Sequence, residues 1–418
     1  MTARASIGET MKITNVEAFA IQAEPSDKRA YWGSRAWGES RPTQRKTEVS
    51  TEYPPPQRRR PIYSRTIDTV LVRVSTDEGL IGYGEAKAPV APQVTRQIID
   101  LLLKDVVMGQ DPRDITVLWE RMYAGMRVRG HRAGFYLEAI AGLDIALWDL
   151  AGKAAGAPIH RLMGGAFRNP VRVYASGLPA LDINRSDEQF EALAEEAADI
   201  QRRGFTGLKM ALGRGIEGDL KSVRIVREKL GDEFIIHADA AGVYDRAQAL
   251  RLGRELEALN LGFFELPIPP EDIEGYAQLA NALAIPIACD TLMIRHEAAD
   301  YLRRGGLDIV QPDVCRAGGI TECRRIAELA DVFGAAFAPH LSIGSAIQFA
   351  ASAHLASAMP NTITCEYWIG DNPLGNCLLK EPLRLENGYL HTPDAPGLGI
   401  ELRPEGLAQF GVVPHPAE

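Results

Sequence analysis

The pattern of apolar and polar positions changes character near Val171. Downstream of it, short apolar runs alternate with stretches in which apolar residues recur every three or four positions. The runs are typical of buried strands and the stretches of amphipathic helices. Strands are predicted near 171–175, 207–212, 234–239, 262–266, 285–289, 307–312, 335–339 and 361–366. Helices are predicted near 187–203, 217–230, 245–259, 271–283, 294–304, 318–333 and 343–358.

Eight strands that alternate with helices over roughly 200 residues indicate an α/β fold with a (β/α)8-type barrel. A doubly wound open sheet is the main alternative. It is less favoured because no glycine-rich GxGxxG turn follows an early strand.

The chain before the barrel has a different pattern. A strand is predicted at 11–22, a hairpin at 66–75 and 80–85, and helices at 92–108, 112–127 and 132–155. This mixture predicts an α+β capping domain over 1–165, a barrel over 166–373 and a segment over 374–418 that returns to the cap. The irregular stretch 24–64, which contains Trp32 and the basic cluster Arg58–Arg60, is predicted to be a lid loop, with a solvated charge run as the alternative for the arginines.

Composition narrows the class of protein. The 418 residues include 46 Lys and Arg against 55 Asp and Glu, so the formal net charge is −9. An acidic balance argues against nucleic acid as a partner. No apolar run approaches the length of a membrane span, and no signal peptide is evident. Five cysteines without CxxC spacing fit a reducing compartment, so we expect a cytoplasmic protein.

Three carboxylates follow successive predicted strands at a repeated spacing. Asp239, Glu265 and Asp290 lie 26 and 25 residues apart, about the length of one strand–helix unit. In a barrel such positions face one point at the carboxyl ends of the strands. An oxygen-only ligand set suits Mg²⁺. A lone Asp at such a place is more often a helix cap, but the repetition favours the metal site.

The next strand ends carry a candidate base. Asp313 and His340 end consecutive predicted strands, where a carboxylate can fix the tautomer of an imidazole and leave its other nitrogen as a base. A purely structural histidine is the alternative. Glu366 is predicted to close the ring and to donate a hydrogen bond or a proton if burial raises its pKa. Lys209 is predicted to bind a substrate carboxylate or, alternatively, to act as an acid or base with a lowered pKa.

With these residues in place, the chain resembles the mandelate racemase subgroup of the enolase superfamily. The segments that carry the resemblance are IALWDLAGKAAGAP, QPDVCRAGGIT, APHLSIGSAIQ and PGLGIEL. The resemblance implies Asp239, Glu265 and Asp290 as Mg²⁺ ligands, Asp313 and His340 as the dyad, and Glu366 as the strand-eight glutamate. Arg316 falls where some members carry lysine. Ala211 replaces the second lysine of the KxK motif of racemases, and Ala241 replaces an Asn or His of many members.

The resemblance also implies the reaction chemistry that is known for this superfamily. Its members abstract the proton alpha to a carboxylate. With the second base missing, we expect a dehydratase of aldonates or aldarates, in which His340 or Tyr244 supplies the leaving-group proton. An epimerase or cycloisomerase is the first alternative, and a ligand-binding barrel without catalysis is the second. The substrate is expected to be a small carboxylate contacted by Arg316, Arg129, His131 and loop 24–64, in a homo-oligomer.

Overall fold

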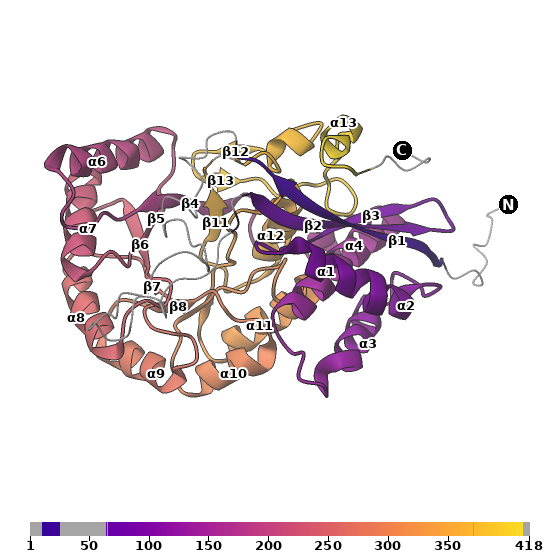
Figure 1. Ribbon diagram of the computed structural model, residues 1–418, viewed down its shortest axis with the longest axis horizontal. Coiled ribbons are helices and arrows are strands. Elements are labelled where there is room, and N and C mark those ends of the chain that lie inside the picture. The colour runs from indigo at the N-terminus through magenta and orange to yellow at the C-terminus, as the bar shows by residue number, and fades with distance from the viewer. Residues whose placement is uncertain (1–10, 26–63, 65, 371, 413–418) are drawn as a thin grey trace, which may run out of the picture.

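A computed structural model of the protein describes residues 11–25, 64, 66–370 and 372–412. Most of the predicted lid loop, Trp32 included, lies outside the described residues. Figure 1 shows a ring of strands and helices on one side and the cap on the other. Within the described residues, no helix is long and apolar enough to cross a membrane.

The cap is built on a three-stranded antiparallel sheet in the order β1–β2–β3. Its strands are β1 (Ile13–Ala23), β2 (Ile67–Thr76) and β3 (Ile81–Ala86), and its helices are α1 (Pro92–Ile98), the π-helical η3 (Ile99–Leu103), α2 (Lys104–Val107), α3 (Ile115–Arg127), α4 (Phe135–Ala155) and α5 (Ile159–Leu162). These bounds confirm the predicted strands and helices of this region. The predicted helix 92–108 contains a π-helical turn in its middle.

Helix α4 is the central element of the cap. Its residues from Tyr136 to Gly152 are buried on every side, as expected for a helix between a sheet and a barrel. Close approach to the sheet depends on Gly84 and Gly142, because a Cβ atom at Gly84 would lie 1.9 Å from the carbonyl oxygen of Gly142. On the barrel side, Trp148 donates a hydrogen bond of 2.9 Å to Thr321 at the start of α11 (Ile320–Val332).

Eight parallel strands form the barrel, and the prediction of a (β/α)8-type fold is confirmed. The strands are β4 (Val171–Pro179), β5 (Gly207–Ala211), β6 (Ile235–Asp239), β7 (Phe264–Glu265), β8 (Ile287–Cys289), β9 (Ile309–Val310), β10 (Ala336–Phe337) and β11 (Cys365–Trp368). Strand β11 pairs with β4, and a bridge between Phe337 and Thr362 joins β10 to the segment that precedes β11, so the ring closes.

The outer layer consists of seven further helices of the described chain. They are α6 (Asp187–Arg202), α7 (Ile216–Leu230), α8 (Arg246–Glu257), α9 (Ile273–Ala282), α10 (Arg295–Arg303), α11 and α12 (Ala346–Ala358). Each agrees with a predicted helix to within a few residues. Local signals explain the starts: Asp245 and Gln248 form a capping box at α8, and the Ser345 hydroxyl accepts from the backbone N–H of Ile347 at α12.

The C-terminal segment passes the barrel and reaches the cap. It contains the 3₁₀ turn η4 (Asn376–Leu378), β12 (Leu385–Glu386), β13 (Tyr389–Leu390) and α13 (Pro404–Ala408). Strand β13 pairs with the first residues of β4. Further on, the backbone N–H of Leu398 donates to Asp149 of α4 at 2.8 Å. The segment therefore links the barrel to the cap.

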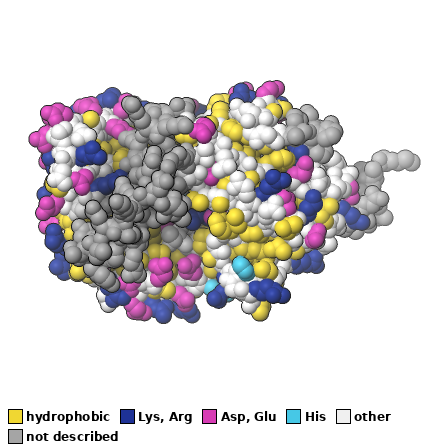
Figure 2. Space-filling model, in the orientation of Figure 1, with side chains coloured by type: hydrophobic (Ala, Val, Ile, Leu, Met, Phe, Trp, Pro, Cys, Tyr) yellow, Lys and Arg dark blue, Asp and Glu magenta, His cyan; other side chains and the backbone are white. Residues whose placement is uncertain are grey.

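Charged side chains are mixed on the surface in view. In the described part of the face in Figure 2, both acidic and basic side chains lie along the rim, with small acidic groups at the upper left and the lower edge. A binding surface for nucleic acid requires a continuous basic stripe.

A buried histidine pair predicts how stability depends on pH. The Nδ1 atoms of His160 and His354 lie 3.1 Å apart, and His354 Nε2 lies 3.0 Å from the carbonyl oxygen of Leu398. Burial lowers the pKa of His354 to about 3. Because an unfolded histidine binds a proton below about pH 6.5, the stability that neutral His354 contributes is complete above that pH and is lost as the pH falls towards 3.

Between pH 7 and pH 5, the loss from His354 alone is about 2 kcal/mol. We therefore expect His354→Gln to lose about 2 kcal/mol less free energy of unfolding than the wild type over this interval. Equilibrium urea unfolding at both pH values measures the difference. The control is His391→Gln, because His391 is only partly buried. Equal losses in H354Q and the wild type would contradict the prediction.

Candidate active site

Strand ends bring the predicted carboxylates together. Asp239 and Glu265 are the last residues of β6 and β7, and they are paired in register across the two strands. Asp290 directly follows β8, whereas Asp313 and His340 lie three residues beyond β9 and β10. The carboxyl ends of the strands therefore form one polar surface, as the barrel rule requires.

Two candidates lie within strands, not at their ends. Lys209 is the middle residue of β5, whose last residue is Ala211, and Glu366 is the second residue of β11. The strand predicted at 361–366 begins later, as β11. Residues 361–363, which precede it, form backbone hydrogen bonds with Phe337 of β10. Both side chains point into the barrel, because they contact each other across it at 3.0 Å.

Lys209 lies among three carboxylates of the site. Its Nζ lies 2.9 Å from Glu265, 3.0 Å from Glu366 and 3.7 Å from Asp239. Burial lowers the pKa of Lys209, but the neighbouring carboxylates of Glu265 and Glu366 outweigh it and hold the pKa well above its usual value. This arrangement favours a cationic Lys209 over the alternative of an acid or base with a lowered pKa.

The carboxylates are crowded beyond what Lys209 can neutralise. Burial, together with the charge of Asp290, raises the pKa of Asp239 to about 6 in spite of Lys209. Burial and three neighbouring carboxylates likewise raise the pKa of Glu265 well above its usual value, although Lys209 opposes this. A divalent cation would relieve this repulsion.

The donor set fits a hard divalent metal. Ligand atoms of Glu265, Asp290 and His340 all lie within 4.8 Å of one another. Among the described residues, Asp290 Oδ1 is buried and has no hydrogen-bond partner, which leaves an oxygen lone pair for a ligand. Asp239 is not in this group of three: its Oδ1 accepts from the backbone N–H of Ala241 at 2.8 Å, and its Oδ2 faces Lys209. Asp239 nevertheless lies beside Glu265 in register.

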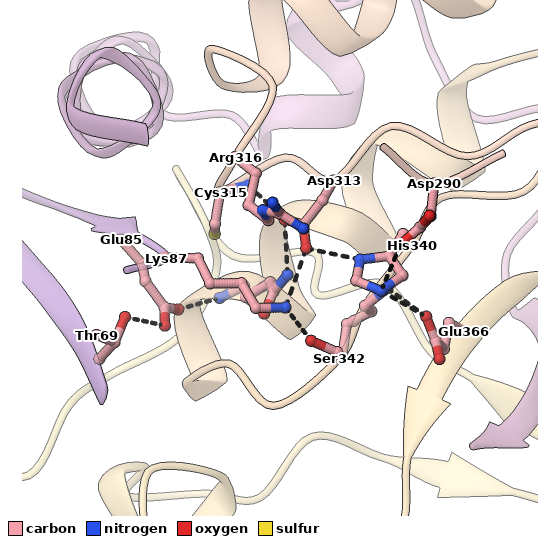
Figure 3. A network of polar contacts seen from close by, with 12 residues as sticks. Thr69, Glu85, Lys87, Asp290, Asp313, Cys315, Arg316, His340, Ser342 and Glu366 are labelled. Atoms are coloured by element: carbon pink, nitrogen blue, oxygen red, sulfur yellow. Dashed lines mark hydrogen bonds and ion pairs between the residues drawn. The ribbon is translucent and has the colours of Figure 1, made fainter. Parts of the chain in front are cut away.

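Asp313 and His340 form a hydrogen-bonded pair (Figure 3). His340 Nδ1 lies 2.9 Å from Asp313 Oδ2. A carboxylate in this position accepts the Nδ1 proton and leaves the Nε2 lone pair free. Nε2 lies 3.6 Å from both Asp290 and Glu366, so it faces the same space as the candidate metal ligands. The geometry suits a general base.

Glu366 is an acceptor in this arrangement. Burial raises its pKa, but the charges of Lys209 and His340 outweigh burial and lower the pKa below its usual value. Its Oε2 also accepts from the backbone N–H of Leu341 at 2.8 Å. The ion pair with Lys209 favours the charged form of Glu366 and thus a role as acceptor over the predicted role as proton donor.

Arg316 is the one predicted substrate contact that the structure places beside the dyad. It lies next to Asp313, and its Nε is 3.4 Å from Glu138 of α4. Its side chain is 29% exposed, although Nε itself is buried. Glu138 of the cap therefore forms an ion pair with a cation of the barrel.

Three of the other predicted contacts are residues that the structure describes: Tyr244, Arg129 and His131. Tyr244 is buried, and its hydroxyl donates to Asp219, so a role as leaving-group acid would require this bond to open. Arg129 and His131 are exposed in the turn between α3 and α4. Trp32 lies outside the described residues. The roles of all four remain predictions.

Two site residues were not predicted from the sequence. Lys87 of the cap lies 3.2 Å from Asp313 Oδ2, and Gln348 of α12 donates to Asp313 Oδ1 at 2.8 Å. The sequence held a weak signal for Lys87, which follows an apolar strand at β-spacing from Glu85. The structure buries both charged residues, which is uncommon for unpaired charges. Nothing in the sequence linked Gln348 to Asp313.

Comparison with known proteins agrees with this architecture. Residues 46–164 match the family model of the mandelate racemase / muconate lactonizing enzyme N-terminal domain, and residues 192–406 match the enolase C-terminal domain-like model. A D-galactarolactone cycloisomerase of Agrobacterium fabrum is 35% identical over 351 residues, which cover 82% of this chain and 90% of the relative. An arabinonate dehydratase of Saccharolobus solfataricus is 35% identical over 339 residues, covering 81% and 89%.

Solved structures agree as well. The crystal structure of a member of the enolase superfamily from Agrobacterium tumefaciens has a TM-score of 0.85 and 30% identity, and it covers 96% of this chain and 99% of that one. The family models span both the cap and the barrel, and both relatives match over most of their length. The chain therefore belongs to the mandelate racemase subgroup of the enolase superfamily.

Proposed function

We propose that the protein is an Mg²⁺-dependent acid-sugar dehydratase, which removes the proton alpha to the carboxylate of an aldonate or aldarate and expels the beta hydroxyl as water. One observation carries the proposal: a complete His340–Asp313 pair faces the carboxylate cluster, while Ala211 stands at the place of a second base. Racemisation needs a base on each face of the alpha carbon, whereas elimination needs one. The relative named arabinonate dehydratase supports this choice.

His340 is the proposed base. Its Nε2 takes the alpha proton, and the positive charge that forms on the ring is stabilised by Asp313 through the Nδ1 hydrogen bond of 2.9 Å. Asp313 remains ionised throughout, because it also contacts Lys87 at 3.2 Å. The proton on Nε2 is then available for the leaving hydroxyl of the same substrate.

Positive charge must balance the dianion that forms when a carboxylate loses its alpha proton. Asp239, Glu265 and Asp290 would hold Mg²⁺, which when bound supplies charge to the substrate carboxylate. The chain's own cations are Lys209, fixed by Glu265 and Glu366, and the partly exposed Arg316. Both bind and orient the substrate carboxylate in this proposal.

Elimination of water then completes the reaction. The electron pair of the alpha C–H bond passes first into the dianion and then forms a double bond between the alpha and beta carbons as the beta C–O bond breaks. His340 returns its proton to the departing oxygen, so water leaves, and the enol rearranges to a 2-keto-3-deoxy acid. Tyr244 is the alternative donor, but its hydroxyl is engaged by Asp219.

A cycloisomerase is the second candidate, and the relative named D-galactarolactone cycloisomerase favours it. The same His340–Asp313 pair would act on a lactone, and the leaving oxygen would stay attached to the molecule. Mass separates the two reactions, because a cycloisomerase product has the mass of its substrate and a dehydratase product is lighter by one water.

The test is a screen of aldonates, aldarates and their lactones with the folded protein and Mg²⁺ in D₂O, followed by NMR and mass spectrometry. We expect a 2-keto-3-deoxy product from at least one acid sugar. Deuterium incorporation at the alpha carbon without loss of water would favour an isomerase. No 2-keto-3-deoxy product from any acid sugar would refute the dehydratase.

A further inference from the structure

Lys87 connects the cap to the candidate base (Figure 3). It directly follows β3 of the cap, and its side chain is almost fully buried. Its Nζ lies 3.2 Å from Asp313 Oδ2 and also contacts the hydroxyl of Ser342. Its backbone N–H donates to the carbonyl oxygen of Cys315 at 3.0 Å. A single cap residue is thus tied to the two loops that carry Asp313 and His340.

The contacts of Asp313 leave its carboxylate little freedom. Oδ2 is shared between His340 Nδ1 at 2.9 Å and Lys87 Nζ at 3.2 Å. Oδ1 accepts from Gln348 Nε2 and from the backbone N–H of Cys315, both at 2.8 Å. A rotation that released His340 would also break the buried ion pair with Lys87, and such a break is strongly destabilising.

Lys87 also sets the charge of Asp313. Burial raises the pKa of the Asp313 carboxyl, but the charge of Lys87 is the largest of the influences that lower it, ahead of His340 and Arg316, and the pKa ends well below its usual range. An ionised Asp313 accepts the Nδ1 proton of His340 and cannot donate in its place. Lys87 of the cap therefore supports the ionised form of Asp313, which it contacts at 3.2 Å.

We propose that Lys87 is a positioning residue of the base, which holds Asp313 so that His340 keeps its Nδ1 proton and presents Nε2 to the substrate. The inference rests on the proposed function in that His340 is the base. In the alternative, Lys87 only attaches the cap to the barrel. Glu85 on the same face of β3 already does this, because it accepts from the backbone N–H and the hydroxyl of Ser345 at the start of α12.

Lys87→Met and Lys87→Arg test the proposal. Methionine keeps most of the side-chain volume without the charge, whereas arginine retains the charge. The matched control is Lys153→Met, because Lys153 is a cap lysine that contacts the buried Asp149 at 2.7 Å, away from the dyad. We expect kcat to fall roughly 10- to 100-fold in K87M with KM nearly unchanged, to recover partly in K87R, and to stay at the wild-type level in K153M.

A second measurement does not require turnover. In ¹⁵N-histidine-labelled protein, the ring signals of His340, assigned with the H340N variant, report its tautomer and its hydrogen bond. We expect these signals to change in K87M and to remain as in the wild type in K153M. Should K87M fail to fold, Ser342→Ala removes the hydroxyl that holds Lys87 and is expected to shift the same signals.

The two measurements separate the two hypotheses. Changed His340 signals in a protein that dehydrates no acid sugar would refute the proposed function and leave the positioning role supported. His340 signals that are alike in K87M and K153M would overturn the positioning role, and so would an unchanged kcat in K87M once a substrate is known.

Discussion

Replacement of His340 with asparagine is expected to lower turnover of the substrate roughly 10³- to 10⁴-fold while ligand binding persists. Asparagine retains a polar side chain that can donate to Asp313, but it has no nitrogen that can accept the alpha proton at neutral pH. The loss should therefore appear in kcat, with little change in KM. Steady-state kinetics and deuterium exchange at the alpha carbon measure the two effects separately.

The matched control is His391→Asn, because His391 lies beside β13 and contacts Glu386, away from the strand ends that form the site. Its turnover should equal that of the wild type. Undiminished alpha-proton exchange in H340N would contradict the assignment of the base. If the wild type binds a carboxylate without converting it and H340N binds it equally well, the ligand-binding barrel without catalysis would be favoured.

H340N also decides whether His340 is a metal ligand, because His340 belongs to the group of three residues whose ligand atoms cluster. We expect Mg²⁺ to raise the melting temperature of H340N as it does that of the wild type. A lost metal response in this variant would assign His340 to the metal and not to proton transfer.

Glu265→Gln is expected to abolish the stabilisation by Mg²⁺ and to lower activity by more than roughly 100-fold. Glu265 is fully buried, and its carboxylate contacts Lys209 at 2.9 Å and Gln311 at 2.9 Å. The amide keeps nearly the same shape but removes one negative charge from beside Asp239 and Asp290. A hard cation binds a neutral amide much more weakly than a carboxylate.

Melting temperatures over an MgCl₂ titration give the readout. A ligand at 100 times its Kd stabilises a protein by about 2.7 kcal/mol, so the wild type should show a clear rise and E265Q none. Asp182→Asn is the control, because Asp182 is an exposed carboxylate shortly after β4, at the same edge of the barrel. An E265Q titration that matches the wild type would remove Glu265 from the ligand set.

Much of the site could be predicted from the sequence, because in a (β/α)8 barrel the residues at the carboxyl ends of the strands lie together at one end of the barrel. Strands that alternate with helices at a spacing near 25 residues must run parallel, so their carboxyl ends share one edge. This placed Asp239, Glu265, Asp290, Asp313 and His340 together before any coordinates were known. The roles as Mg²⁺ ligands, the homo-oligomer and the cytoplasmic location stay predictions.

The directions of the pKa shifts in the site could not be predicted from the sequence. The pKa of Lys209 is raised by the charges of Glu265 and Glu366, and that of Glu366 is lowered by the charges of Lys209 and His340. Burial alone would lower the pKa of Lys209 and raise that of Glu366. The sign of a pKa shift depends on distances between strands, and hydrophobic periodicity carries no information on those distances.

Chain order and hydrophobic period by themselves determined the barrel, the cap and the ring of acidic strand ends, because those features depend on local spacing. Only the tertiary structure showed that Lys87, 226 residues before Asp313, contacts its carboxylate, and that the Tyr244 hydroxyl donates to Asp219. The reason is physical: a contact between domains depends on how two folded surfaces dock, and neither surface exists until each domain has formed.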